Sequence, residues 1–169
     1  MVLHMLKSAL ALSLSLGAAL AAPAGAQLLG GAPKQDVKDV WKPAATPQGG
    51  TPWKLLESTK ESQRISAGVI YSKPVFSAGV KSLAGKQIKV AGWMMPLDKA
   101  AKQKRFVLLA YPPGCPFHFH AMPNQFIEVM APAGVQLNER DPMVIAGTLQ
   151  LTGQDESGIF YRMVNAKKV

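Results

Sequence analysis

Alternating apolar and polar positions run through the second half of the chain and predict β-strands. Between residues 86 and 94, one face carries Ile88, Val90, Gly92 and Met94, and these alternate with Gln87, Lys89, Ala91 and Trp93. Residues 105–110 form a short continuous apolar run, as in a strand buried on both faces. Further strands are predicted at residues 125–130, 143–152 and 159–164.

Five short strands within about 80 residues, with no long helical pattern between them, favour a small β-barrel. Gly92 and Gly147 sit in the middle of strands, where a closing barrel needs a bend or a bulge. We therefore expect a mainly β fold, a five-stranded OB-like barrel, with a small β-sandwich as the alternative. The residues expected to share its core are Ile88, Val90, Leu108, Ile127, Ile145, Leu149 and Tyr161.

A short helix is predicted just before this region. Thr51 can cap it, Pro52 suits its first position, and Trp53 begins its apolar face. Residues 66–84 contain several glycines and a proline, and we expect a packed irregular segment with at most one helical turn. The basic cluster at 99–105 is expected in a solvated loop between the first two strands.

The N-terminal residues 1–26 have the three parts of a secretory signal peptide. Lys7 supplies a positive charge, residues 9–20 are apolar, and Ala24 and Ala26 place small residues before a cleavage site at Gln27. A membrane anchor is the alternative, but the run contains Ser, Gly and Pro and ends without a stop-transfer cluster. The expected location is the periplasm, and the mature protein is expected to be soluble.

The mature chain is expected to comprise a flexible lead at 27–52 and one barrel domain at 53–169. The lead is rich in Pro and Gly, which disfavours a packed core, although Trp41 within it could dock on a partner. The formal net charge is +9 from 19 Lys and Arg against 10 Asp and Glu. Such a charge suggests an acidic partner or anionic lipid, and nucleic acid is the least expected partner of an exported protein.

The chemistry-bearing residues are concentrated in one place. Cys115 is the only cysteine, so no intrachain disulfide can form, and apart from His4 in the signal the histidines are His118 and His120. Cys-x-x-His and His-x-His spacings suit zinc or copper, and Met122 could complete a copper site. More distant candidates are Met94, Met95 and Glu128.

Three alternatives stay open for this segment. It can be a proline-rich structural loop without a metal. A thioredoxin-like redox motif would need a second cysteine where His118 stands and a helix where Pro123 falls. A Cys–His nucleophile pair lacks any identified orienting group. No enzymatic activity is predicted.

Several motifs together resemble a known family. They are Gly92-Trp-Met-Met-Pro-Leu97, Gly114-Cys-Pro-Phe-His118 and Pro123-Asn-Gln125, followed by residues 144–149 and 158–163. They resemble an uncharacterised family of bacterial exported proteins and lipoproteins, the domain of unknown function 3299, over residues 53–169. The resemblance implies an OB-like barrel, an envelope location, no established catalysis and an accessory role in metal handling beside a transporter. Relatives carry cysteine at the position of His118, and this chain lacks a lipid-anchoring cysteine in its signal.

The sequence therefore predicts a periplasmic, non-enzymatic accessory protein that binds zinc or copper through Cys115, His118, His120 and Met122. An envelope transporter component or an acidic protein is the expected partner. The alternative function is a metal-free OB-like module that binds a protein or envelope partner.

Overall fold

The computed structural model describes residues 42–113 and 121–169 of the chain. The predicted signal peptide and Trp41 lie outside the described residues, as do Cys115, His118 and His120. The elements that precede the barrel are, in chain order, α2 (Trp53–Leu56), β1 (Lys60–Ser66), β2 (Val69–Val75) and α3 (Ala78–Lys81). The barrel strands are β3 (Gln87–Pro96), β4 (Lys102–Leu109), β5 (Phe126–Gln136), β6 (Met143–Leu151) and β7 (Tyr161–Lys168), with the short 3-10 helix η1 (Pro123–Gln125) before β5.

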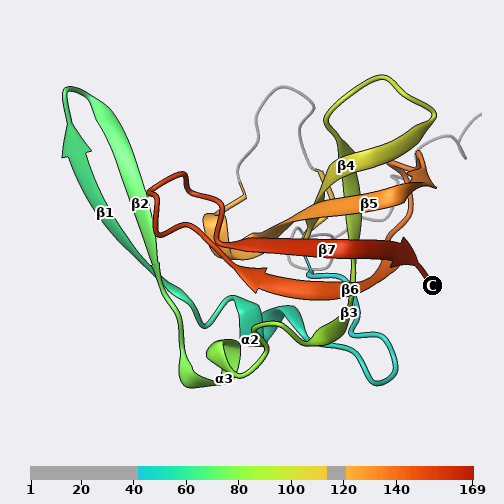
Figure 1. The fold of residues 1–169 in the computed structure, drawn as a ribbon, viewed down its shortest axis with the longest axis horizontal. Helices are drawn as coiled ribbons and strands as arrows, with labels where there is room; N and C mark the ends of the chain where they lie inside the picture. Colours follow the sequence, from blue (N-terminus) through green and yellow to red (C-terminus); the bar gives the residue numbers. More distant parts are fainter. Residues whose placement is uncertain (1–41, 114–120) are drawn as a thin grey trace, which may run out of the picture. The chain divides into compact units, whose positions relative to one another are not determined.

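Five strands close into a barrel in the order β3-β4-β5-β7-β6 (Figure 1). All neighbouring pairs are antiparallel except β5 and β7, which are parallel. A five-stranded Greek-key barrel is the architecture of the OB-fold. The predicted OB-like barrel is confirmed, and the β-sandwich alternative is wrong.

The barrel core contains every residue that the alternating pattern assigned to it. The seven side chains are between 0 and 7% exposed and belong to one apolar cluster: Ile88, Val90, Leu108, Ile127, Ile145, Leu149 and Tyr161. Trp53, Leu56 and Val80 join the same cluster from α2 and α3. The two short helices therefore complete the core.

The two mid-strand glycines lie where the barrel bends. At Gly147 the pairing of β6 with β7 shifts register, and a Cβ there would lie 2.6 Å from Cγ of Met163 and 2.9 Å from the Val164 carbonyl oxygen. At Gly92 strand β3 leaves β6 and begins to pair with β4, and a Cβ would lie 2.5 Å from the Leu109 carbonyl oxygen. A side chain at either position would overlap the neighbouring strand. The irregularity predicted at Gly147 is present as the register shift between β6 and β7.

The start of α2 differs from the prediction. Pro52 occupies the N-cap position and no side chain caps the helix. Thr51 instead donates its backbone N–H to the Lys89 carbonyl oxygen at 2.8 Å. The Trp53 indole N–H donates to the Ala91 carbonyl oxygen at 2.7 Å, which fastens the helix to β3.

The prediction of an irregular segment at 66–84 is wrong for its first part. Strands β1 and β2 form an antiparallel hairpin, in which Ile65 opposes Ile70. The turn between them is Ala67-Gly68, with φ of 49° and 77°, and two consecutive positive φ values are typical of a type I′ hairpin turn. The expected single helical turn is present as α3, and Ser77 caps it by accepting a hydrogen bond from Val80 N.

One further boundary differs from the sequence pattern. Strand β4 begins at Lys102, so much of the basic cluster at 99–105 belongs to a strand and not to a loop. Gln103 is wholly buried and its amide N–H groups donate to Asp98 and to the Ala100 carbonyl oxygen. The turn before β4 is thus held by a side chain from the cluster itself.

The last part of the predicted lead lies against the barrel. Ala44 N donates to the Ala110 carbonyl oxygen at 2.8 Å, and Lys89 Nζ donates to the Gln48 carbonyl oxygen at 2.8 Å. Within residues 42–113 and 121–169, no helix has the length and apolar character needed to cross a membrane.

Candidate functional site

The segment that carries the predicted metal ligands connects β4 to β5, and its ends meet. Ala110 N donates to the Gln125 carbonyl oxygen at 2.9 Å. Because Cys115, His118 and His120 lie outside the described residues, their geometry is not tested. Met122 is described, and its side chain is 49% exposed.

Glu57, just after α2, holds both ends of this segment. Its Oε1 accepts hydrogen bonds from the Tyr111 hydroxyl at 2.9 Å and from Gln125 Nε2 at 3.2 Å. Asn124 Nδ2 donates to the carbonyl oxygens of Glu57 and Thr59, each at 3.0 Å. Burial, with a further contribution from the Glu57 hydrogen bond, raises the pKa of Tyr111. The phenol therefore stays a neutral donor at physiological pH.

The chain re-enters the barrel through η1. Gln125 N donates to the Met122 carbonyl oxygen at 2.8 Å, and Met122 N donates to Gln125 Oε1 at 3.1 Å. Strand β5 follows directly at Phe126. A thioredoxin-like site would need a longer helix here, and Pro123 instead opens a three-residue 3-10 helix.

Of the more distant candidate ligands, Met94 and Glu128 have other contacts. Met94 is 1% exposed and belongs to the barrel core. Met95 lies on β3, half-buried. Both carboxylate oxygens of Glu128 are already paired with arginines. Among the described residues, no group of three or more His, Cys, Asp or Glu side chains could hold a metal ion.

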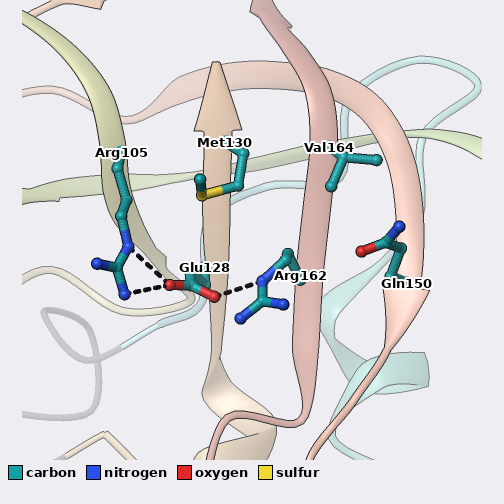
Figure 2. Close-up of a pocket in the computed structure, with 6 residues that line it drawn as sticks. All are labelled: Arg105, Glu128, Met130, Gln150, Arg162 and Val164. Atoms are coloured by element: carbon teal, nitrogen blue, oxygen red, sulfur yellow. Dashed lines mark hydrogen bonds and ion pairs between the residues drawn. The ribbon is translucent and has the colours of Figure 1, made fainter. Parts of the chain in front are cut away.

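Glu128 instead organises a charged cluster on the outer face of the barrel, which the sequence did not reveal. Its carboxylate is 3% exposed although its neighbours Ile127 and Val129 point into the core. Arg105 of β4 donates to Oε1 from Nε at 2.8 Å and from Nη2 at 2.6 Å. Arg162 of β7 donates from Nε to Oε2 at 2.6 Å. Figure 2 shows the carboxylate between the two guanidinium groups.

The protonation of this cluster follows from its surroundings. Burial alone would raise the pKa of Glu128, but hydrogen bonds and charge from Arg162 and Arg105 outweigh it and hold the pKa below its ordinary value. The carboxylate is therefore ionised at neutral pH. The cluster borders a hollow of about 430 Å³ that Met130, Gln150 and Val164 also line (Figure 2).

Comparison with known proteins identifies the family. A family model described as "Protein of unknown function (DUF3299)" matches residues 34–167. The chain is a member of the DUF3299 family. The family resemblance expected from the motifs is confirmed, and the match begins upstream of residue 53.

No curated protein matches this DUF3299 protein. Among solved structures it is similar to a crystal structure of a DUF3299 family protein from Pseudomonas aeruginosa PAO1, with 23% sequence identity and a TM-score of 0.44. The match covers 57% of this chain and 67% of the other.

Proposed function

We propose that this protein is a non-enzymatic, periplasmic accessory protein that binds one zinc or copper ion in the segment between β4 and β5. Cys115, His118 and His120 are the proposed ligands, since both metals accept thiolate and imidazole. The observation that carries the proposal is the hydrogen bond from Ala110 N to the Gln125 carbonyl oxygen. It closes the segment at its base, so that a ligand set within it is attached to the barrel at both ends.

The contacts of Glu57 support the same proposal. Tyr111 and Gln125, one at each end of the segment, donate to a single carboxylate oxygen. Fixing the ends of a loop in the folded protein reduces the entropy that a ligand must later remove. Residues on a closed loop of this kind are therefore better prepared to gather around an ion than residues on an open chain.

Met122 distinguishes the two metals. Its half-exposed thioether stands at the edge of η1, and thioethers select copper(I) over zinc. A copper site would include this side chain, whereas a zinc site would leave the fourth position to water or a partner. An envelope transporter component or an acidic protein is the proposed partner. The family resemblance supports the first, and the positive net charge supports the second.

Calorimetric titration of the reduced protein with zinc or copper(I) tests the proposal. We expect about one ion per chain, with proton release and weaker binding as the pH falls through the histidine range near 6.5. The Cys115→Ala variant and the His118→Ala/His120→Ala variant should lose binding and stay folded. If all three residues are replaced by alanine and one ion per chain still binds, the ligand assignment is contradicted. If the reduced parent binds no zinc or copper, the proposed function is contradicted.

A paired methionine comparison separates the metals. Met122→Leu should weaken copper(I) binding and leave zinc binding unchanged, because only copper(I) uses the thioether. Met130→Leu is the matched control, since Met130 lies on β5 beside the Glu128 cluster. Equal effects of the two substitutions would exclude Met122 as a ligand.

The second candidate function is a metal-free interaction module. The hollow beside Arg105 and Arg162 favours the interaction module. The two arginine side chains are 58% and 39% exposed, respectively, so their guanidinium N–H groups can also donate hydrogen bonds to a carboxylate of a partner. This function predicts no stoichiometric metal uptake in the titration above. It also predicts that Arg162→Gln weakens capture of an acidic peptide, whereas the metal-site variants leave it unchanged.

A further inference from the structure

The tip of the β1–β2 hairpin exposes three large aliphatic side chains. Ile65 is 73% exposed, Ile70 is 61% exposed and Val69 is 51% exposed. Ile65 and Ile70 are direct cross-strand partners, and Val69 is the first residue after the turn. The apolar surface is therefore gathered at one end of the hairpin.

One aromatic and two cationic side chains follow immediately behind this tip. The next cross-strand pair is Arg64 with Tyr71, and the Arg64 guanidinium lies 4.0 Å from the centre of the Tyr71 ring. Lys73 follows on the same face of the hairpin, opposite Ser62. Aliphatic groups followed by a tyrosine is the order in which side chains meet a membrane surface from the acyl region outward. The two cations share one carboxylate, that of Glu156, which leaves this part of the hairpin with one net positive charge.

Residues directly behind the tip attach the hairpin to the loop before β7. Glu156 forms ion pairs with Arg64 and with Lys73, the latter at 3.4 Å. Ser72 forms a parallel bridge with Ser157. A Cβ placed on Gly68 in the turn would meet no atom within 4 Å, and Figure 1 shows the turn pointing away from the barrel. The hairpin therefore presents its tip from a fixed base.

We propose that this tip docks the protein peripherally on an anionic lipid surface. Residues 1–26 contain one Lys and no acidic residue, so the formal net charge of the exported chain is 9 − 1 = +8, which attracts it to such a surface. The three aliphatic side chains enter the outer acyl region. Three partly exposed aliphatic side chains offer much less surface than the ~800 Å² per partner that a stable protein interface needs. A lipid surface fits a projection of this size better than a second copy of the chain does.

Binding to vesicles tests this docking in the exported protein, whose N-terminus is first established by intact mass. Vesicles of equal parts phosphatidylglycerol and phosphatidylcholine should bind the parent, and pure phosphatidylcholine should bind it at least tenfold more weakly. Ile65→Ser/Ile70→Ser should reduce binding to the anionic vesicles at least fivefold. The matched control is Val75→Ser, because Val75 is 55% exposed at the opposite end of β2, and it should bind like the parent.

A position-specific readout keeps the proposal testable even if the N-terminal segment itself binds lipid. Brominated acyl chains should quench the fluorescence of an Ile70→Trp variant, beyond the quenching of the parent, and should not do so for Val75→Trp. Absence of this extra quenching would overturn the proposal. Equal binding to both vesicle types, or dimerisation that the serine variant abolishes without lipid binding, would also overturn it.

Discussion

Replacing Glu128 by glutamine should destabilise the barrel, because the carboxylate joins three strands through charge-assisted hydrogen bonds. Arg105 and Arg162 donate to it from β4 and β7, with N–O distances of 2.6 to 2.8 Å. A hydrogen bond to a charged group contributes about 1.5–3 kcal/mol, but both arginine side chains are partly exposed and regain water when the carboxylate is lost. We therefore expect the free energy of unfolding at pH 7 to fall by about 1–2 kcal/mol. Urea unfolding, with unchanged m-values, measures it.

The pH dependence of that difference identifies its cause. The arginines lower the pKa of Glu128 in the folded state, so its stabilisation is present above the ordinary glutamate pKa of about 4.3. It is lost as the pH falls through the lowered folded pKa. The gap between parent and variant should therefore close in acid. Glu156→Gln is the matched control. Glu156 also pairs with two cations, Arg64 and Lys73, but these lie on the exposed β1–β2 hairpin. A Glu128→Gln effect no larger than that of the control, or independent of pH, would refute the reasoning.

Four further predictions follow, three from the fold and one from the N-terminal sequence. Tyr161→Phe should lower the free energy of unfolding by about 1–3 kcal/mol, because the buried hydroxyl bonds to Leu56 O and Thr59 Oγ1 at 2.6 Å each; an unchanged urea midpoint would contradict it. Burial raises the pKa of Tyr161 to about 12, so spectrophotometric titration should detect no ionisation of this phenol below pH 11, and earlier ionisation would show that it is not buried. Gly147→Ala should cost about 1–3 kcal/mol by overpacking, since its Cβ would lie 2.6 Å from a β7 side chain; a neutral thermal melt would contradict the close approach. The exported chain should begin at or near Gln27 by intact mass, and retention of residues 1–26 would favour an anchor.

The barrel was predictable because its strands bury one face and therefore carry a period of two. Ile145, Gly147 and Leu149 share one face of β6, opposite Thr148 and Gln150, and Ile145 and Leu149 are wholly buried in the core. Register and closure could not be read from this pattern. The parallel pairing of β5 with β7 joins strands that are not consecutive in the chain, and no local signal reports it.

The hairpin and the Glu128 cluster escaped prediction for two physical reasons. Strand β1 is polar and mostly exposed on both faces, so it shows no alternation. Its position is fixed by the turn at Gly68 and by contacts with the distant Glu156. The Glu128 cluster depends on three strands meeting side by side. In the sequence, Arg105, Glu128 and Arg162 are single charged residues in three separate strands, and nothing near them indicates that their side chains meet.

The sequence indicated the candidate ligands of the segment between β4 and β5, but not the contacts of Glu57 that hold its ends. The spacing of Cys115, His118 and His120 identifies ligand chemistry from neighbouring residues alone. Glu57, which holds the ends of the segment, lies 54 residues before Tyr111 in the chain. Only the folded arrangement relates it to the segment.

X-ray absorption at the zinc or copper edge of the metal-loaded, reduced protein tests the central claim most directly. If Cys115, His118 and His120 bind the ion, the spectrum should contain one sulfur at about 2.3 Å and two imidazole nitrogens near 2.0 Å, with a second sulfur for copper bound by Met122. Any metal that Cys115→Ala still takes up when the ion is in large excess should lack the cysteine sulfur at about 2.3 Å. A first shell without sulfur in the parent, or a spectrum that Cys115→Ala leaves unchanged, would contradict the proposed site.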